Sequence, residues 1–272
     1  MFSSNAPGAA TALGANTRAR GDVGGRPYTG RVRRSLLVVP LLVLALAGCA
    51  SAGDPDQQRA LEVPEASALE PAVNPVVDPW AGLPTLIDAD WAGRTAEATG
   101  IPRRAMLAYG GAAVYVANQN PSCNLGWNTL AGIGEMESHH GTIFDGAIED
   151  DGLVTPPIYG IALDGADTHT IPDSDKGAID GDPEWDRAVG PLQFIPDSWQ
   201  NWGTDGSGDG AVDPHNFDDA VLATANYLCH AGGDLSLDDN WRAAIAAYND
   251  AAPYAEGVAE YAIRYSNEAS TS

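Results

Sequence analysis

Apolar side chains recur at helical spacing along most of the chain after residue 80. In residues 103–120, for example, Met106, Ala113 and Ala117 fall on one stripe, as the 3.6-residue period of an amphipathic helix requires. Runs of alternating apolar and polar residues, which indicate strands, are nearly absent. The sequence therefore predicts a mainly α domain, with helices at residues 103–120, 127–138, 198–202, 218–232, 240–250 and 257–269.

Residues 145–189 interrupt this pattern. The segment is rich in Gly, Asp and Pro and has little regular periodicity. A loop of that length inside a compact domain is usually functional or an insertion. We therefore expect a helical body that carries long irregular loops.

The N-terminus has the features of an export signal. Residues 1–34 contain six arginines and one acidic residue, and residues 36–48 are a 13-residue apolar run, too short for the roughly 20 residues of a spanning helix. The run ends in Leu-Ala-Gly-Cys at 46–49, which matches the bacterial lipobox. We predict a signal peptide over 1–48 and a lipid-modified Cys49 that anchors the exported protein to the outer face of the cell membrane. An ordinary signal with a nearby cysteine is the alternative.

The mature chain is strongly acidic. Loss of residues 1–48 removes six of 14 basic and one of 37 acidic residues, which leaves 8 against 36 and a net charge of −28. Such a surface repels nucleic acid, so we expect no nucleic-acid partner. Residues 49–79 are rich in Pro, Ala, Glu and Asp and predict an extended linker. A folded domain at 80–268 and a tail at 269–272 follow.

Two further cysteines, Cys123 and Cys229, remain once Cys49 carries lipid. An even number of cysteines in an exported protein predicts a disulfide. Two buried free thiols are the alternative.

Two glutamates lie two positions apart in the sequence GIGEMESHHG at 132–141. On a helix, residues at this spacing point about 200° apart, so the two carboxyls occupy different faces. Glu137 continues the stripe of Leu130 and Ile133 and therefore lies on the apolar side, whereas Glu135 is turned away from it. A carboxyl in apolar surroundings has a raised pKa and can act as a general acid. Glu137 is the candidate catalytic residue, and Glu135 is expected to have no catalytic part.

Three segments together resemble one enzyme family. Residues 137–141 match the E-S-x-x-G signature of bacterial lytic transglycosylases, 188–199 resemble the family's A-x-G-x-x-Q-F-x-P-x-S-W segment, and 243–249 match its late A-x-x-A-Y-N segment. The resemblance is strongest to the membrane-bound B type, in its actinobacterial lipoprotein form.

This resemblance implies a goose-lysozyme-like helical domain that cleaves the MurNAc–GlcNAc β-1,4 bond of peptidoglycan and forms a 1,6-anhydromuramyl product. Glu137 would act as acid and then as base, without a cofactor for catalysis, and we expect a monomer that acts on glycan strands. One alternative is a lysozyme-type hydrolase with Asp186 or Asp164 as its second carboxylate. Another is a non-catalytic cell-wall-binding lipoprotein.

The resemblance also suggests residues that contact substrate. Ser138 would orient the sugar or cap the helix, and Gln193 would hydrogen-bond the sugar or be a core amide. Phe194 would stack on sugar or lie in the core, and Tyr248 resembles the family tyrosine that approaches the catalytic carboxyl. The adjacent histidines at 139–140 diverge by about 100° on a helix, so we do not expect them to share a metal.

A separate loop, DGSGDGAVDPHN at 205–216, has the pattern of an EF-hand. Carboxylate and carbonyl oxygens on a tight turn suit Ca²⁺, and the membrane-bound B type has such a loop at this place. The twelfth position, usually a bidentate acid, is an asparagine here. We expect a structural Ca²⁺ bound through Asp205, Ser207, Asp209, Ala211, Asp213 and Asn216, with an affinity weakened by the asparagine. An Asp/Gly-rich turn without an ion is the alternative.

Overall fold

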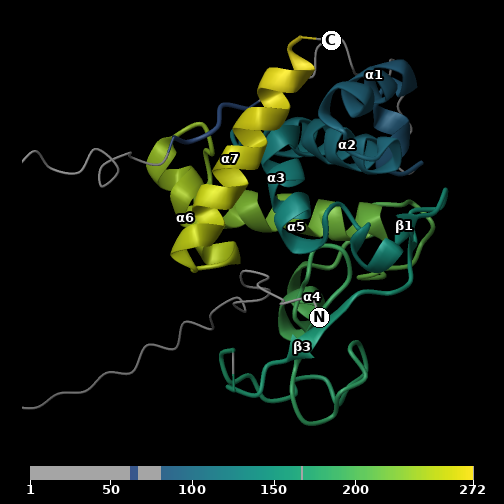
Figure 1. Cartoon of the computed structure of the whole chain (residues 1–272), viewed down its shortest axis with the longest axis vertical. Helices are drawn as coiled ribbons and strands as arrows, with labels where there is room; N and C mark the ends of the chain where they lie inside the picture. The colour runs from purple at the N-terminus through teal and green to yellow at the C-terminus, as the bar shows by residue number, and fades with distance from the viewer. Residues whose placement is uncertain (1–61, 67–80, 167, 272) are drawn as a thin grey trace, which may run out of the picture. The chain divides into compact units, whose positions relative to one another are not determined.

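The structure is a computed structural model that describes residues 62–66, 81–166 and 168–271. The signal peptide, Cys49 and most of the predicted linker lie outside the described residues. The described part is mainly α, as predicted, with seven α-helices and two 3-10 helices (Figure 1). They are η2 (Leu83–Leu86), α1 (Ala89–Thr99), α2 (Arg103–Gln119), α3 (Trp127–Ser138), η3 (Ile143–Asp145), α4 (Pro196–Trp202), α5 (Phe217–Gly232), α6 (Asp238–Tyr248) and α7 (Ala252–Ala269).

The predicted helices begin and end within two residues of the observed bounds, except α7, which begins at Ala252 and not at residue 257. The prediction missed α1, whose N-cap Asp88 accepts a hydrogen bond from the Trp91 amide and whose C-cap Gly100 is left-handed. The apolar residues of α1 are few, so its pattern is weaker than that of α2. Residues 62–66, predicted as part of an extended linker, instead contact the domain: Pro64 is buried, and the Asn128 amide donates to the Glu65 carbonyl at 2.8 Å.

Helix α3 packs against α2, α5 and α7, and Figure 1 shows α7 running beside it. Leu130 and Ile133 are fully buried in this packing. Gly132 permits the close approach of α7, because a Cβ atom there would lie 2.6 Å from the Val258 carbonyl oxygen. The helix with the candidate acid is therefore held on several sides by other helices.

Residues 145–189 contain few regular elements, as predicted, although four short strands lie in or at the end of the segment. Strand β1 (Ala147–Ile148) pairs antiparallel with β2 (Val154–Thr155), and β3 (Tyr159–Ala162) pairs antiparallel with β4 (Arg187–Val189). The strands were missed because two to four residues are too few to show alternation. In the rest of the segment, aspartate side chains accept hydrogen bonds from backbone amides that have no strand partner. For instance, Asp173 accepts hydrogen bonds from three backbone amides.

A buried ion pair fastens one of these hairpins to the helices. Arg104 of α2 contacts both carboxylate oxygens of Asp218 in α5 and also donates to the Asp150 carbonyl in the β1–β2 turn. Burial raises the pKa of Asp218, and the bonds from Arg104 act against this effect. The pair joins α2, α5 and the start of the long loop.

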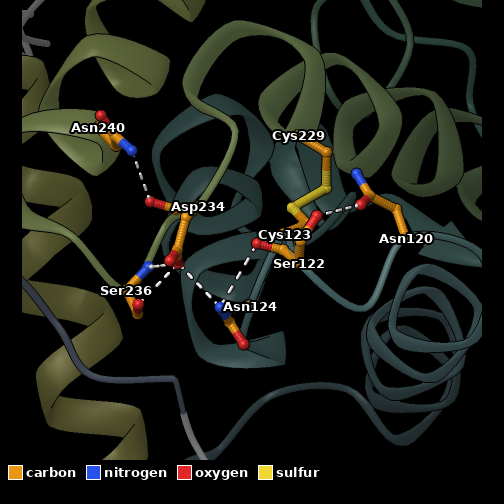
Figure 2. Close-up of a disulfide and its surroundings, with 8 residues drawn as sticks. All are labelled: Asn120, Ser122, Cys123, Asn124, Cys229, Asp234, Ser236 and Asn240. Atoms are coloured by element: carbon orange, nitrogen blue, oxygen red, sulfur yellow. Dashed lines mark hydrogen bonds between the residues drawn. A yellow bond between two sulfur atoms is a disulfide. The ribbon is translucent and has the colours of Figure 1, made fainter.

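The predicted disulfide is present. Cys123 and Cys229 are bonded, which joins the segment after α2 to α5 (Figure 2). Beside it, Asp234 accepts hydrogen bonds from the hydroxyl and amide of Ser236 and from the side-chain amide of Asn124, and these bonds lower the pKa of its carboxyl. The alternative of two free thiols is excluded.

No helix among the described residues is long and apolar enough to span a membrane.

Replacing both cysteines with serine should lower the free energy of unfolding by about 4–5 kcal/mol, because the bond joins residues 106 positions apart and restricts a long loop of the unfolded chain. Denaturant unfolding of residues 50–272 without reductant measures this loss. A matched Ser122→Ala variant beside the disulfide should unfold within about 0.5 kcal/mol of wild type. A loss below about 1 kcal/mol in the double variant would contradict the expectation.

Candidate active site

The candidate acid stands at the C-terminal end of α3, just before a sharp reversal of the backbone. His139, His140 and Gly141 are consecutive left-handed residues, with φ of 49°, 60° and 79°. The His139 amide donates to the Glu135 carbonyl and the His140 amide donates to the Gly134 carbonyl, so the turn satisfies two carbonyls at the end of the helix. Glycine normally occupies the left-handed position, and each non-glycine residue there costs roughly 1–2 kcal/mol.

Glu137 is half-buried, and one side chain bonds to its carboxyl. The Tyr254 hydroxyl of α7 donates to Glu137 Oε1 at 2.5 Å. Burial raises the pKa of Glu137 to about 7, although the bond from Tyr254 works in the opposite direction. This carboxyl is therefore divided between its acid and base forms near neutral pH, which general acid–base catalysis requires.

Two tyrosines form one wall of the site. The Tyr248 and Tyr254 rings are stacked, with centroids 6.4 Å apart and planes 12° from parallel. Tyr248 was the expected neighbour of the acid, but its hydroxyl donates to the Leu192 carbonyl at 2.6 Å, and Tyr254 makes the bond to Glu137. The sequence analysis missed Tyr254, although its place after Pro253, in the first turn of a helix, was a usable signal.

The turn at residues 190–193 faces the end of α3. Ser138 Oγ donates to the Pro191 carbonyl and accepts the Gly141 amide, both at 2.7 Å. This hydroxyl therefore joins the turn to the helix end, in agreement with the capping role considered for it. Gln193 is left-handed at φ 49°, and its side-chain amide donates to the Gly190 carbonyl at 2.8 Å. Its Oε1 is not occupied by that bond.

Phe194 lies behind this wall. Its side chain is 1 % exposed and makes edge contacts with Tyr248 and Trp199. Phe194 was expected to contact sugar, and its position corrects this expectation, because a fully buried ring offers no face to a ligand. Phe194 supports Tyr248 from within the core.

The EF-hand-like loop is closed by a residue that was not expected. Asp219 of α5 is buried, and its carboxylate accepts the amides of Gly206, Ser207 and Asp213. Burial raises the pKa of Asp219. Asn216 instead caps α5, because its side chain accepts the Asp218 amide and donates to the Asp151 carbonyl.

The other predicted loop positions lie together in the loop. Asp205 accepts the amides of Gly208 and Gly210, and Asp209 accepts the Ala211 amide. Ser207 donates to Asp205, and Asp213 accepts the His215 amide. The donor set is composed of hard oxygens, which fits Ca²⁺.

A second acidic group lies in the long loop. Asp173, Asp175 and Asp186 each offer a carboxylate oxygen, and these oxygens lie within 4.8 Å of one another. Asp186 accepts hydrogen bonds from the amide and hydroxyl of Ser174, and burial raises the pKa of its carboxyl. Asp164 accepts the Ala166 amide in the same loop. Asp164 and Asp186, the two carboxylates considered for a hydrolase, therefore both form hydrogen bonds within their own loop.

Glu135 occupies a different environment from Glu137. Its carboxylate contacts the rings of His139 and His140 and accepts the Tyr265 hydroxyl, and the bond from His140 contributes most to lowering its pKa, which falls to about 2. With a side chain 17 % exposed, Glu135 is not the spare surface residue that the sequence suggested.

Glu137→Gln should stabilise the protein by up to about 3 kcal/mol at pH 8. The raised pKa means that the folded chain binds more protons than the unfolded chain between about 4.5 and 7, so wild-type stability falls as the pH rises through that range. Glutamine does not titrate, so the difference should disappear at pH 4. Denaturant unfolding at both pH values measures it.

Glu135→Gln, two positions away, is the matched control and should have the opposite sign. The lowered pKa of Glu135 stabilises the folded state above about pH 4.5, and this contribution is lost as the pH falls towards 2. The variant should therefore be less stable than wild type at pH 7. Equal effects of the two substitutions would contradict both assignments.

Comparison with known proteins adds one match. Residues 172–234 match the family model described as a transglycosylase SLT domain, whereas no curated protein and no solved structure matches significantly. The matched segment contains the Gln193 turn, the EF-hand-like loop and Cys229, and it stops short of Glu137 on the N-terminal side. Transglycosylase SLT domains are lysozyme-like and act on the cell wall, so the match agrees with the helical fold and supports a peptidoglycan-cleaving enzyme of the lytic transglycosylase kind.

Proposed function

We propose that this protein is a lytic transglycosylase that cleaves the MurNAc–GlcNAc β-1,4 bond of peptidoglycan, with Glu137 as its single catalytic carboxyl. One observation carries the proposal. Glu137 is a carboxyl of raised pKa whose bonding partner is a tyrosine, and no carboxylate among the described residues contributes to that pKa. The match to the transglycosylase SLT domain supports the same substrate class.

The reaction follows from a carboxyl that is both acid and base near neutrality. Protonated Glu137 donates its proton to the glycosidic oxygen as the C1–O bond breaks. The muramyl C6 hydroxyl then attacks C1, and ionised Glu137 takes the hydroxyl proton. The new C1–O6 bond closes the 1,6-anhydro ring, so no water is consumed and Glu137 ends as it began, protonated.

Tyr254 suits this double role. Its hydroxyl donates to the carboxylate form of Glu137, so it lowers the pKa that burial raises. A pKa near the working pH allows efficient proton transfer in both directions. Tyr248, stacked on Tyr254, and the Ser138 bond to Pro191 keep the wall and the 190–193 turn beside the acid. Gln193 Oε1 is the group that we propose bonds to the sugar.

A hydrolase needs a second carboxylate, to attack the sugar or to activate water. Asp186 and Asp164 are the acids that the sequence offered for this part, and both are bonded within their own loop. The substrate hydroxyl supplies the nucleophile in a transglycosylase, which is why one carboxyl suffices. The site favours this reaction over hydrolysis.

We also propose that residues 205–219 bind a structural Ca²⁺. Asp205, Ser207, Asp209, Asp213 and the Ala211 carbonyl would supply oxygens, and Asp219 would supply the carboxylate that Asn216 lacks. A buried carboxylate of raised pKa gains by the approach of a cation. The ion would brace the loop between α4 and α5, which starts shortly after the Gln193 turn, and it takes no part in the chemistry.

The proposed location rests on the sequence. Cleavage before Cys49 and its lipid modification would leave residues 49–79 as a tether between the membrane and the catalytic domain. We propose an exported monomer that faces the cell wall. Residues 62–66 contact the domain, so this part of the tether would lie against it.

Digestion of purified peptidoglycan by residues 50–272, followed by mass spectrometry, tests the reaction. Wild type and the exposed Glu97→Gln control should release muropeptides that end in 1,6-anhydromuramyl, lighter by one water than hydrolysis products. Glu137→Gln should lose activity by about 10²–10⁴-fold, the usual contribution of an acid–base group. Products with a reducing end would identify a hydrolase, and no product from wild type in the presence of Ca²⁺ would favour the wall-binding lipoprotein.

Calorimetric titration with Ca²⁺ tests the loop. Wild type should bind the ion, and Ca²⁺ should raise its unfolding temperature. At a Ca²⁺ concentration of a hundred times Kd, the free energy of unfolding should increase by about 2.7 kcal/mol. Asp219→Asn should abolish the gain, whereas Asp239→Asn, on an exposed turn of α6, should keep it. Asn216→Ala should lower stability through loss of the cap but leave Ca²⁺ affinity intact. Loss of binding in Asn216→Ala with retention in Asp219→Asn would refute the assignment.

A further inference from the structure

The second glutamate of α3 lies in a buried cluster that the proposed reaction does not use. Glu135 Oε2 lies 2.9 Å from His140 Nε2 and accepts the Tyr265 hydroxyl at 3.1 Å, and Oε1 lies 3.1 Å from His139 Nδ1. Arg264 stacks over the Tyr265 ring at 4.7 Å. Tyr261 also stacks on Tyr265, with ring centroids 6.1 Å apart.

His140 is the centre of the cluster. Its side chain is 5 % exposed, and both ring nitrogens have partners. Nδ1 lies 2.9 Å from the Tyr109 hydroxyl of α2, and Nε2 lies 3.0 Å from the Tyr265 hydroxyl of α7 as well as beside Glu135 of α3. One imidazole therefore joins three helices.

A glycine in α3 makes room for the contact between Tyr109 and His140. A Cβ atom at Gly134 would overlap the Tyr109 hydroxyl, so glycine at this position lets Tyr109 reach across α3 to His140. The Tyr109 hydroxyl can rotate to donate to Nδ1 or to accept from it. The bond between Tyr109 and His140 therefore does not depend on which ring nitrogen carries the hydrogen.

The same histidine belongs to the strained turn that follows the catalytic helix. His140 has φ of 60°, and its amide closes the helix on the Gly134 carbonyl. A left-handed residue without glycine's freedom persists only where its surroundings hold it. The side-chain bonds of His140 provide this restraint. The restrained turn also places Ser138 Oγ against the Gly141 amide and the Pro191 carbonyl.

We propose that Glu135, His140 and Tyr265 form a positioning clamp that holds the left-handed end of α3 and so keeps Glu137 against Tyr254. The clamp side chains bond to one another, whereas the Glu137 carboxyl bonds to Tyr254, so the clamp would act through the backbone of the helix end. This inference rests on the proposed function, since it names what holds the acid of that reaction in place. It gives Glu135 a role that its position two residues from Glu137 did not suggest.

Turnover by clamp variants tests the proposal. Glu135→Gln and His140→Gln should each lower kcat about tenfold to a hundredfold, because small displacements of an acid have effects of this size, while KM changes less than twofold. Glu97→Gln and His169→Gln, both exposed, are the matched controls and should behave as wild type. Assays run well below each variant's unfolding temperature separate positioning from stability. Unchanged kcat in folded clamp variants would overturn the proposal.

A measurement that needs no activity separates this inference from the reaction itself. The pKa of the Glu137 carboxyl, followed by NMR with carbon-13-labelled glutamate, should be about 7 in wild type and the controls and should fall towards 4.5 in the clamp variants as the carboxyl leaves its buried place. Tyr265→Phe removes one hydroxyl and keeps the packing, so its Glu137 pKa tests the clamp if the other clamp variants do not fold. An unmoved Glu137 pKa in every folded variant would refute the clamp, whether or not wild type cleaves peptidoglycan. An inactive wild type with a moved pKa would refute only the proposed reaction.

Discussion

The close packing of α3 against its neighbours is the constraint on which the site depends. Two glycines make it possible: Gly132 lets the α7 backbone approach, and Gly134 lets the Tyr109 hydroxyl cross the helix. Because α3 is enclosed in this way, a carboxyl near its end is partly shielded from water, and no charged group in the described part of the chain bonds to it. Burial raises the pKa of Glu137, and the bond from Tyr254 lowers it by less than burial raises it.

The contrast between Glu135 and Glu137 illustrates how one helix makes two carboxyls chemically different. Two residues of separation turn them to different sides, where one meets a tyrosine hydroxyl and the other meets two histidines and a tyrosine. Burial alone raises a carboxyl pKa, whereas bonds and charge that favour the ionised form lower it. The first environment suits an exchangeable proton, and the second suits a fixed structural charge.

The loops are attached to the helices by side-chain hydrogen bonds. The 190–193 turn is bonded to Ser138 and Tyr248, the EF-hand-like loop is closed by Asp219, and Arg104 holds the first hairpin. Each attachment joins a segment of little regular structure to the end or flank of a helix. The family-model match at residues 172–234 includes the 190–193 turn and the EF-hand-like loop together with helices α4 and α5, so it covers loops and the helices that they join.

The sequence alone predicted the helical class, and it turned Glu137 and Glu135 to different faces of one helix, because apolar periodicity and helical geometry are local properties. The cysteine count indicated a disulfide, and the structure excluded the alternative of two free thiols. The sequence did not determine which tyrosine bonds to the acid, that Phe194 is buried, or that Asp219 closes the loop. Those facts depend on contacts between residues far apart in the chain, such as Glu137 with Tyr254 and Glu135 with Tyr265. Only the tertiary structure brings such pairs together. It also shows that Glu135, which the sequence left without a role, bonds to His140 and Tyr265.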